Sequence, residues 1–208
     1  MIDLPSAIVT ATIWAYWIGV GVMIFRVRRH TRKVAGLVPQ QPLERVMWLG
    51  FLPLVAAWAT LPYLAQTHAH GPLALPAFAT QQPLYAWMRH VAAIVAVVCL
   101  LATARCWVRM GKDWRMAVAV GEDTNLITDG PFRRIRHPIY AFSILLMLAT
   151  AFVVPTVSML IVAAVHVVLF NMKARNEERH LLATSGDAYA QYVRRTGRFI
   201  PRFFAPPR

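Results

Sequence analysis

"TDGPFRRIRHPIY", at residues 128–140, opens the stretch that decides the fold. An almost wholly apolar run over residues 139–170 follows, and "KARNEERHL" at residues 173–181 closes the stretch. Pro155 interrupts the apolar run once. As one helix the run would be about 48 Å long, which exceeds a hydrocarbon core of about 30 Å. We therefore expect a helical hairpin over about 139–153 and 156–172, with charged residues at both of its ends.

The composition is that of a membrane protein. Of the 208 residues, 58% are hydrophobic and only 15% are charged. Soluble domains carry about 45–50% apolar and about 25% charged residues. Further apolar runs at 7–25, 46–64 and 91–108 have the length of membrane spans. The sequence predicts an all-α integral membrane protein with about five transmembrane helices, a cytoplasmic amphipathic helix beginning near residue 177, and a single membrane domain over 1–208.

The positive charge is unevenly distributed along the chain, which has a net charge of +13. Lys and Arg gather in the loop after the first span, in residues 105–137 and in the tail from residue 173, whereas the loop at 65–90 is neutral apart from Arg89. Under the positive-inside rule the three basic regions are cytoplasmic. The N-terminus is then outside and the C-terminus inside, and we expect the bacterial inner (cytoplasmic) membrane. Anionic headgroups account for the charge, so no nucleic-acid partner is expected.

Charged residues at the two ends of the hairpin are the candidates for a functional site. Glu177 and Glu178 are adjacent, and neighbouring helix positions point about 100° apart, so at most one of them faces the interior. They are either solvated charges or, for the inward one, an acceptor of hydrogen bonds from a ligand. Arg133, Arg134 and Arg136 are either headgroup anchors or a site for a carboxylate or phosphate.

No metal is expected. Cys99 and Cys106 lie in one apolar run and are interpreted as small buried apolar residues. His68, His70 and His90 have no nearby Cys or acidic ligands. The chain also has no phosphate-binding or dinucleotide-binding glycine motif.

Several motifs in order resemble the isoprenylcysteine carboxyl methyltransferase family and the related phospholipid N-methyltransferases. The motifs are Thr128-x-Gly130-Pro131-Phe132, Arg136-His137-Pro138-Ile139-Tyr140, an apolar hairpin, Glu177-Glu178-x-x-Leu181, Gly186-Asp187-x-Tyr189-x-x-Tyr192 and Ile200-Pro201. The likeness covers about residues 107–204, which we interpret as a methyltransferase-like cofactor-binding region. Residues 1–106 contribute spans of low specificity.

The resemblance implies S-adenosylmethionine as methyl donor, with S-adenosylhomocysteine as product, bound on the cytoplasmic side. By matching position, the cofactor-binding residues are Leu126, Ile127, Phe132, His137, Pro138, Ile139, Tyr140 and Glu177. Phe132 stands where relatives often have Tyr. Lys173 and Arg136 are the expected catalytic residues. Lys173 stands where the eukaryotic enzymes have a substrate-contacting Arg, and it keeps the charge without the planar fork.

The acceptor implied by the resemblance is a lipophilic or amphipathic molecule: a prenylated carboxylate, a membrane lipid such as a phospholipid amine, or another lipophilic nucleophile. Two other functions remain open. Membrane reductases of sterol-reductase-like architecture bind NADPH, whose 2′-phosphate the basic turn at 133–136 could contact. In a non-catalytic membrane scaffold, the arginines only anchor the protein and Glu177 only forms surface pairs.

Overall fold

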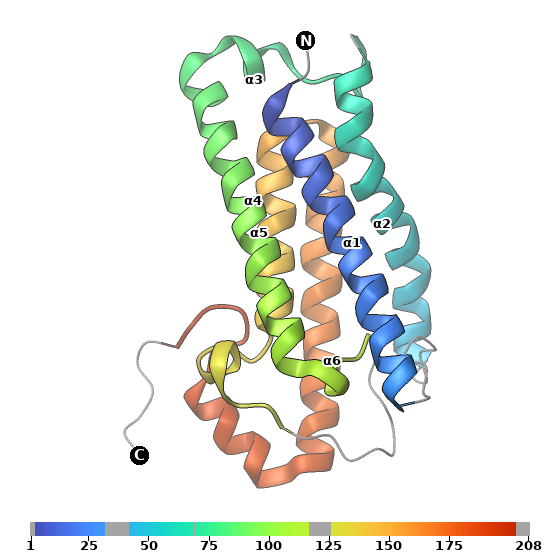
Figure 1. The fold of residues 1–208 in the computed structure, drawn as a ribbon, viewed down its shortest axis with the longest axis vertical. Coiled ribbons are helices and arrows are strands. Elements are labelled where there is room, and N and C mark those ends of the chain that lie inside the picture. Colours follow the sequence, from blue (N-terminus) through green and yellow to red (C-terminus); the bar gives the residue numbers. More distant parts are fainter. Residues whose placement is uncertain (1–2, 32–41, 69, 117–125, 203–208) are drawn as a thin grey trace.

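The computed structural model describes residues 3–31, 42–68, 70–116 and 126–202, and these form an elongated helical bundle (Figure 1). Parts of the predicted cofactor-binding region, residues 117–125 and 203–204, lie outside the described residues, as does most of the basic loop at 32–41. The helices are α1 (Leu4–Thr31), α2 (Pro42–Thr67), α3 (Ala77–Gln81), α4 (Pro83–Met110), α5 (Pro138–Val153) and α6 (Val157–Arg195), with short 3₁₀ turns η1 (Gly111–Asp113) and η2 (Gly130–Arg133).

The all-α membrane fold is confirmed. Helices α1, α2, α4 and α6 are long and apolar enough to cross a membrane, and α5 is a shorter apolar helix of 16 residues. Their outward faces carry exposed apolar side chains such as Ile18, Leu49, Leu101 and Ile161. Large apolar side chains are stable on an outer surface when that surface is covered by lipid.

The hairpin also forms as predicted. Helix α5 ends at Val153, and α6 begins at Val157 after the turn that contains Pro155. The hydroxyl of Thr156 accepts a hydrogen bond of 3.2 Å from the backbone N–H of Met159 and thereby caps α6. Inside the bundle, Ser143 Oγ of α5 and His166 Nε2 of α6 lie 3.2 Å apart. The two arms are therefore joined by polar contacts as well as by apolar packing.

The tail differs from the prediction. We expected a separate amphipathic helix from about residue 177, but α6 continues without a break from the membrane arm and turns only at Gly186. Gly186 has a φ of 47°, which glycine adopts without the steric cost of a Cβ atom. Lys173 and Glu177 therefore lie on one rigid helix, directly after its apolar arm.

The neutral loop at 65–90 is shorter than predicted, because α4 begins at Pro83 rather than near residue 91. Arg89 is only 1% exposed. Its guanidinium donates to both carboxylate oxygens of Asp3 (3.0 and 2.6 Å), to Ser6 and to the carbonyl of Val153. In the sequence Arg89 stands at the edge of an apolar run. In the structure its guanidinium is buried, because these partners accept its hydrogen bonds and Asp3 neutralises its charge.

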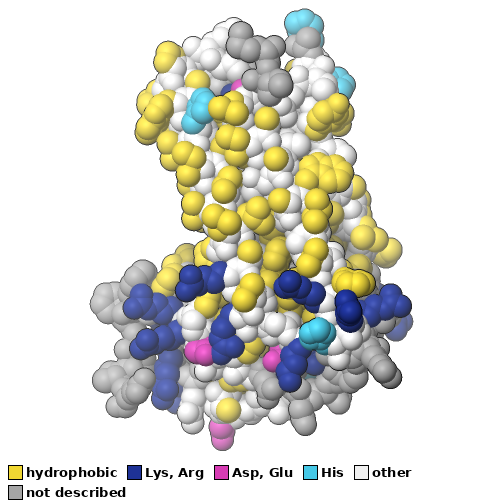
Figure 2. Space-filling model, viewed as in Figure 1, with side chains coloured by type: hydrophobic (Ala, Val, Ile, Leu, Met, Phe, Trp, Pro, Cys, Tyr) yellow, Lys and Arg dark blue, Asp and Glu magenta, His cyan; other side chains and the backbone are white. Residues whose placement is uncertain are grey.

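Charge separates along the bundle axis. Figure 2 shows Lys and Arg gathered around one end and apolar side chains over the rest of the face. α1 begins at the opposite end, and the turn after Gly186 lies at the basic end (Figure 1). The described Lys and Arg residues of the regions predicted to share one side of the membrane therefore lie together at this end.

After α6 the chain folds back beneath the start of α5. The backbone N–H groups of Arg136 and His137 donate to the carbonyls of Gly197 (2.8 Å) and Arg198 (3.1 Å). A Cβ atom at Gly197 would lie 1.8 Å from the carbonyl oxygen of Ile200, so only glycine fits there. This short pairing fixes the turn that precedes α5.

Candidate active site

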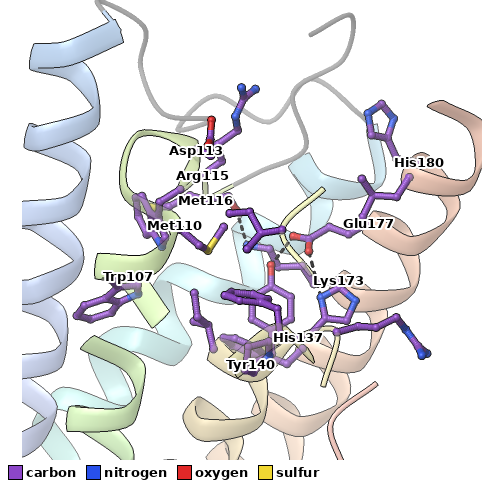
Figure 3. Close-up of a pocket in the computed structure, with 18 of the residues that line it drawn as sticks. Trp107, Met110, Asp113, Arg115, Met116, His137, Tyr140, Lys173, Glu177 and His180 are labelled. Atoms are coloured by element: carbon purple, nitrogen blue, oxygen red, sulfur yellow. Dashed lines mark hydrogen bonds and ion pairs between the residues drawn. The ribbon is translucent and has the colours of Figure 1, made fainter. Parts of the chain in front are cut away.

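A cavity of about 240 Å³ opens at the basic end of the bundle. All ten residues predicted for the site line it: Leu126, Ile127, Phe132, Arg136, His137, Pro138, Ile139, Tyr140, Lys173 and Glu177. They come from the segment that runs through η2 to the start of α5, and from α6 (Figure 3). Segments far apart in the sequence thus converge on one space, although what each residue binds stays a prediction.

The turn at 130–137 brings its residues to the cavity through a defined backbone. Gly130 has a φ of 55°, and the ring of Phe132 is buried two residues later. The phenol of Tyr192 donates a 2.6 Å hydrogen bond to the carbonyl of Phe132. Pro138 occupies the first position of α5. Proline is well suited to this position, because a backbone N–H there would have no partner within the helix.

Glu177 is the central acceptor of the cavity wall. The phenol of Tyr140 donates a short hydrogen bond to one carboxylate oxygen, and His137 Nδ1 lies 3.5 Å from the other. The rings of His137 and Tyr140 are stacked, with centroids 5.3 Å apart. His137 is the N-cap residue of α5 and Tyr140 lies three positions later in its first turn, so the two side chains lie on one side and meet the carboxylate together (Figure 3).

His137 lies between two carboxylates and is 8% exposed. Its Nε2 is 3.4 Å from Glu178 Oε1, an ion-pair contact without the alignment of a hydrogen bond. Burial by itself lowers the pKa of His137, but contacts with Glu177 and Glu178 outweigh burial and raise the pKa above the ordinary value of 6.5. The charged imidazolium is thereby favoured next to the cavity.

Lys173 lies one helical turn before Glu177, so both point to the same side of α6. Its ammonium donates to the carbonyl of Met116 and lies 5.4 Å from the centroid of the Tyr140 ring. Figure 3 shows it on the same side of the cavity as Glu177. The predicted cation, Lys173, therefore lies at the cavity. Its ammonium already donates to a backbone carbonyl and lies over the face of an aromatic ring.

Arg136 reaches the cavity wall, but its guanidinium is directed at other partners. Nε donates to Glu178 Oε1 at 2.9 Å, and Nη1 donates to the carbonyl of Thr196 at 2.5 Å. Glu178 is 8% exposed, and its carboxylate also accepts hydrogen bonds from two nitrogens of Arg198. Glu178 is therefore not the solvated surface charge considered from the sequence. It is a buried anchor for the returning tail.

The apolar wall includes residues that the sequence analysis did not assign to the site. Tyr16, Trp17 and Val20 of α1 and Trp107 and Met110 of α4 face the cavity. Aromatic residues in the middle of the first span are the signal that could have indicated them. From the tail, Tyr189 and Tyr192 also line it, and both belong to the Gly186-Asp187-x-Tyr189-x-x-Tyr192 motif quoted above.

Five residues that line the cavity carry a buried polar atom with no hydrogen-bond partner among the described residues. The atoms are Trp17 Nε1, Trp107 Nε1, His137 Nε2, His180 Nε2 and Tyr189 Oη. Buried polar atoms are normally paired, and an unpaired one costs about 1–3 kcal/mol. Several such atoms around one cavity are the pattern of a site that receives a polar ligand.

Among the described residues, no group of three His, Cys, Asp or Glu side chains is arranged to hold a metal ion. Cys99 and Cys106 are free and buried, as interpreted from the sequence.

Comparison with known proteins gives a family for the central part of the chain. Residues 91–183 match the isoprenylcysteine carboxyl methyltransferase (ICMT) family. The predicted resemblance is therefore confirmed over a region that contains most of α4, all of α5 and all ten predicted site residues.

Two curated relatives match over 94 residues, which is 45% of this chain and 44% of each relative. They are the cobalt-zinc-cadmium resistance protein CzcN of Cupriavidus metallidurans, 30% identical, and the nickel-cobalt-cadmium resistance protein NccN of Alcaligenes xylosoxydans xylosoxydans, 26% identical. The chain thus matches less than half of the length of these relatives.

Proposed function

We propose that this protein is a membrane methyltransferase that transfers a methyl group from S-adenosylmethionine to a lipophilic or amphipathic acceptor at the cytoplasmic face. The observation that carries the proposal is one cavity lined by all ten predicted site residues. The match of residues 91–183 to a family of methyltransferases supports it.

The cavity suits the cofactor chemically. Glu177 offers a carboxylate to hydroxyl or amino groups, and the unpaired atoms of His180 and Tyr189 offer further polar contacts. Leu126, Ile127 and Phe132 would pack against the apolar parts of the molecule. Aromatic rings such as that of Tyr140 attract cations at their faces, which suits a positively charged sulfonium.

When bound, S-adenosylmethionine supplies an electrophilic methyl group carried by a sulfonium. The protein residues position the reactants and exclude water, and holding two reactants in line supplies much of the rate enhancement of a displacement reaction. His137 and Tyr140 hold the Glu177 carboxylate in one orientation. The aromatic residues of α1 and α4 close the side of the cavity that faces the apolar core.

The location at the cytoplasmic face follows from charge. The cavity opens at the end of the bundle where Lys and Arg gather, and the positive-inside rule assigns that end to the cytoplasm. The N-terminus is then outside, and in a bacterial cell the membrane is the inner membrane. Anionic headgroups would contact the basic side chains around the opening.

The decisive experiment measures binding of S-adenosylhomocysteine and, separately, NADPH to the detergent-purified protein by calorimetry. Wild type is compared with Glu177→Gln and His137→Ala, and Asp187→Asn is the control because Asp187 is an exposed carboxylate on the same helix. We expect saturable binding of S-adenosylhomocysteine that weakens about 10-fold or more in the first two variants, since each loses a charged hydrogen-bond partner.

Binding of NADPH in place of S-adenosylhomocysteine would replace the methyltransferase proposal with a reductase. A folded protein that binds neither compound would act as a scaffold and would overturn the enzyme proposal.

A further inference from the structure

A second, smaller cavity of about 30 Å³ adjoins the first, between α2 and α6. Phe51, Met116, Phe170 and Lys173 line both cavities. The remaining lining residues are Glu44, Met47, Trp48 and Leu169. Lys173 therefore stands between the predicted cofactor region and a narrow apolar space that contains one carboxylate.

Glu44 was not among the predicted site residues, yet it is only 3% exposed. It lies in the first turn of α2, where the partial positive charge of the helix N-terminus stabilises an ionised carboxylate. Its negative charge acts on both the Lys173 ammonium and the Tyr140 phenol. Glu44 is thus electrostatically connected to the catalytic candidates from the opposite side of the bundle.

The charges around Lys173 argue against a carboxylate acceptor. The ammonium lies under the influence of two carboxylates, the half-buried Glu177 and the buried Glu44. Arg136, the other cation expected to bind a carboxylate, is paired with Glu178. The imidazolium of His137 is likewise engaged by Glu177 and Glu178. An incoming carboxylate would therefore meet negative groups and cations that they already compensate, and like charges side by side in an interface cost several kcal/mol.

We propose that the acceptor group is an amine on an amphipathic molecule, and that Glu44 holds this amine and takes up the proton that it releases. The inference rests on the proposed methyl transfer and names its substrate class. The apolar part of the acceptor would lie against Met47, Trp48 and Leu169, next to the lipid-exposed side chains Leu49 and Leu52 of α2.

The reaction balances with these groups. The nitrogen lone pair of the neutral amine forms a bond to the methyl carbon, and the bond from that carbon to sulfur breaks with both electrons passing to sulfur. The amine enters as an ammonium ion that donates to the Glu44 carboxylate, and before the attack it gives one proton to that carboxylate, which passes the proton to water. The product leaves as the N-methylammonium ion.

The first test is a binding comparison that does not depend on turnover. Octylamine and octanoate, two amphiphiles of equal chain length and opposite charge, are titrated into protein saturated with S-adenosylhomocysteine, and the affinities are measured by calorimetry. Wild type is compared with Glu44→Gln, and Asp187→Asn again serves as the control that removes an exposed carboxylate.

We expect wild type and Asp187→Asn to bind octylamine more tightly than octanoate. In Glu44→Gln the affinity for octylamine falls about 10- to 100-fold, because a charged hydrogen bond is lost. Binding of S-adenosylhomocysteine stays within about twofold in all three proteins, since Glu44 does not line the larger cavity.

The second test follows labelled methyl groups from S-adenosylmethionine into octylamine and octanoate. An N-methyl label survives alkaline treatment, whereas a methyl ester releases labelled methanol. We expect alkali-stable label that falls about 100-fold in Glu44→Gln, the size typical of losing a proton acceptor in catalysis.

Octanoate binding as tight as octylamine binding, no binding of octylamine, alkali-labile label, or an unchanged amine preference in Glu44→Gln would each overturn the inference. A wild type that does not bind S-adenosylhomocysteine would instead overturn the proposed function, so the two failures are distinguishable.

Discussion

At the scale of single residues, Glu177 and Glu178 carry the same chemical group and face different parts of the protein. Glu177 faces the cavity and accepts the Tyr140 phenol, whereas Glu178 is paired with Arg136 and Arg198. His137 lies between them, within 3.5 Å of one and 3.4 Å of the other. The charge of His137 therefore holds both carboxylates in place.

The raised pKa of His137 predicts a pH-dependent stability. The folded state binds the proton more tightly than the unfolded state, so the stabilisation is fully present below about pH 6.5 and is lost as pH rises through the raised pKa. We expect the difference in melting temperature between wild type and His137→Gln to be largest near pH 6 and to shrink at alkaline pH. Parallel melting curves of the two proteins from pH 6 to 9 would contradict this prediction.

Arg136 gives a second prediction at this scale. Because its guanidinium holds Glu178 and the carbonyl of Thr196, Arg136→Gln should destabilise the fold by about 3–5 kcal/mol, the cost of breaking a buried ion pair. Denaturant unfolding measures the loss, and Arg134→Gln, at an exposed neighbouring position, is the control.

The double variant Arg136→Gln/Glu178→Gln should recover part of that loss, because no buried charge is then left alone. A purely catalytic Arg136 would give the opposite pattern, with normal unfolding and lost activity.

At the scale of secondary-structure elements, close contact between α1 and α4 shapes one wall of the cavity. Gly19 of α1 lies against Trp107 of α4, and a Cβ atom there would approach the indole ring to 2.5 Å. Trp107 also lines the cavity. Because Gly19 has no Cβ atom, the Trp107 indole can lie close to α1, and this contact determines the position of the indole in the cavity wall.

Gly19→Ala should therefore destabilise the bundle by about 1–3 kcal/mol through overpacking and weaken S-adenosylhomocysteine binding as Trp107 shifts. Gly21→Ala is the matched control, since a Cβ atom at Gly21 meets nothing within 4 Å. Thermal unfolding and calorimetry on both variants test this. Equal behaviour of the two would show that the α1–α4 contact does not shape the site.

At the scale of the whole molecule, polar anchors hold the two ends of the bundle and an apolar core lies between them. At the end opposite the cavity, Arg89 joins the Asp3 carboxylate to the carbonyl of Val153 at the end of α5. The tail contacts of Gly197 and Arg198 hold the cavity end. The core residues Leu146, Met147 and Met159 are fully buried in between.

Arg89→Met should destabilise the whole bundle by about 3–5 kcal/mol, because it leaves the Asp3 carboxylate and a buried carbonyl without their donor. In the folded fraction, S-adenosylhomocysteine binding should be unchanged, since the cavity lies at the other end. Arg109→Met, which breaks the exposed pair with Asp129, should leave stability near wild type. Loss of ligand affinity in stable Arg89→Met protein would disprove this independence of the two ends.

The sequence by itself determined the all-α membrane class and the hairpin around Pro155. These features depend on local chemistry: the length of apolar runs and the break that proline imposes. The same reasoning singled out the charged residues at the two ends of the hairpin. The resemblance to a known family supplied the cofactor-binding candidates and Lys173, including Leu126 and Ile127, which no local pattern indicates.

Only the tertiary structure decided which side each charge faces and what it is paired with. Arg89 is buried because Asp3, 86 positions away in the chain, neutralises it, and Glu178 is buried because Arg198 returns beneath α5. Glu44 shares a cavity with Lys173 because α2 packs against α6. Burial and pairing of charges depend on contacts between distant segments, which periodicity and composition along one segment do not encode.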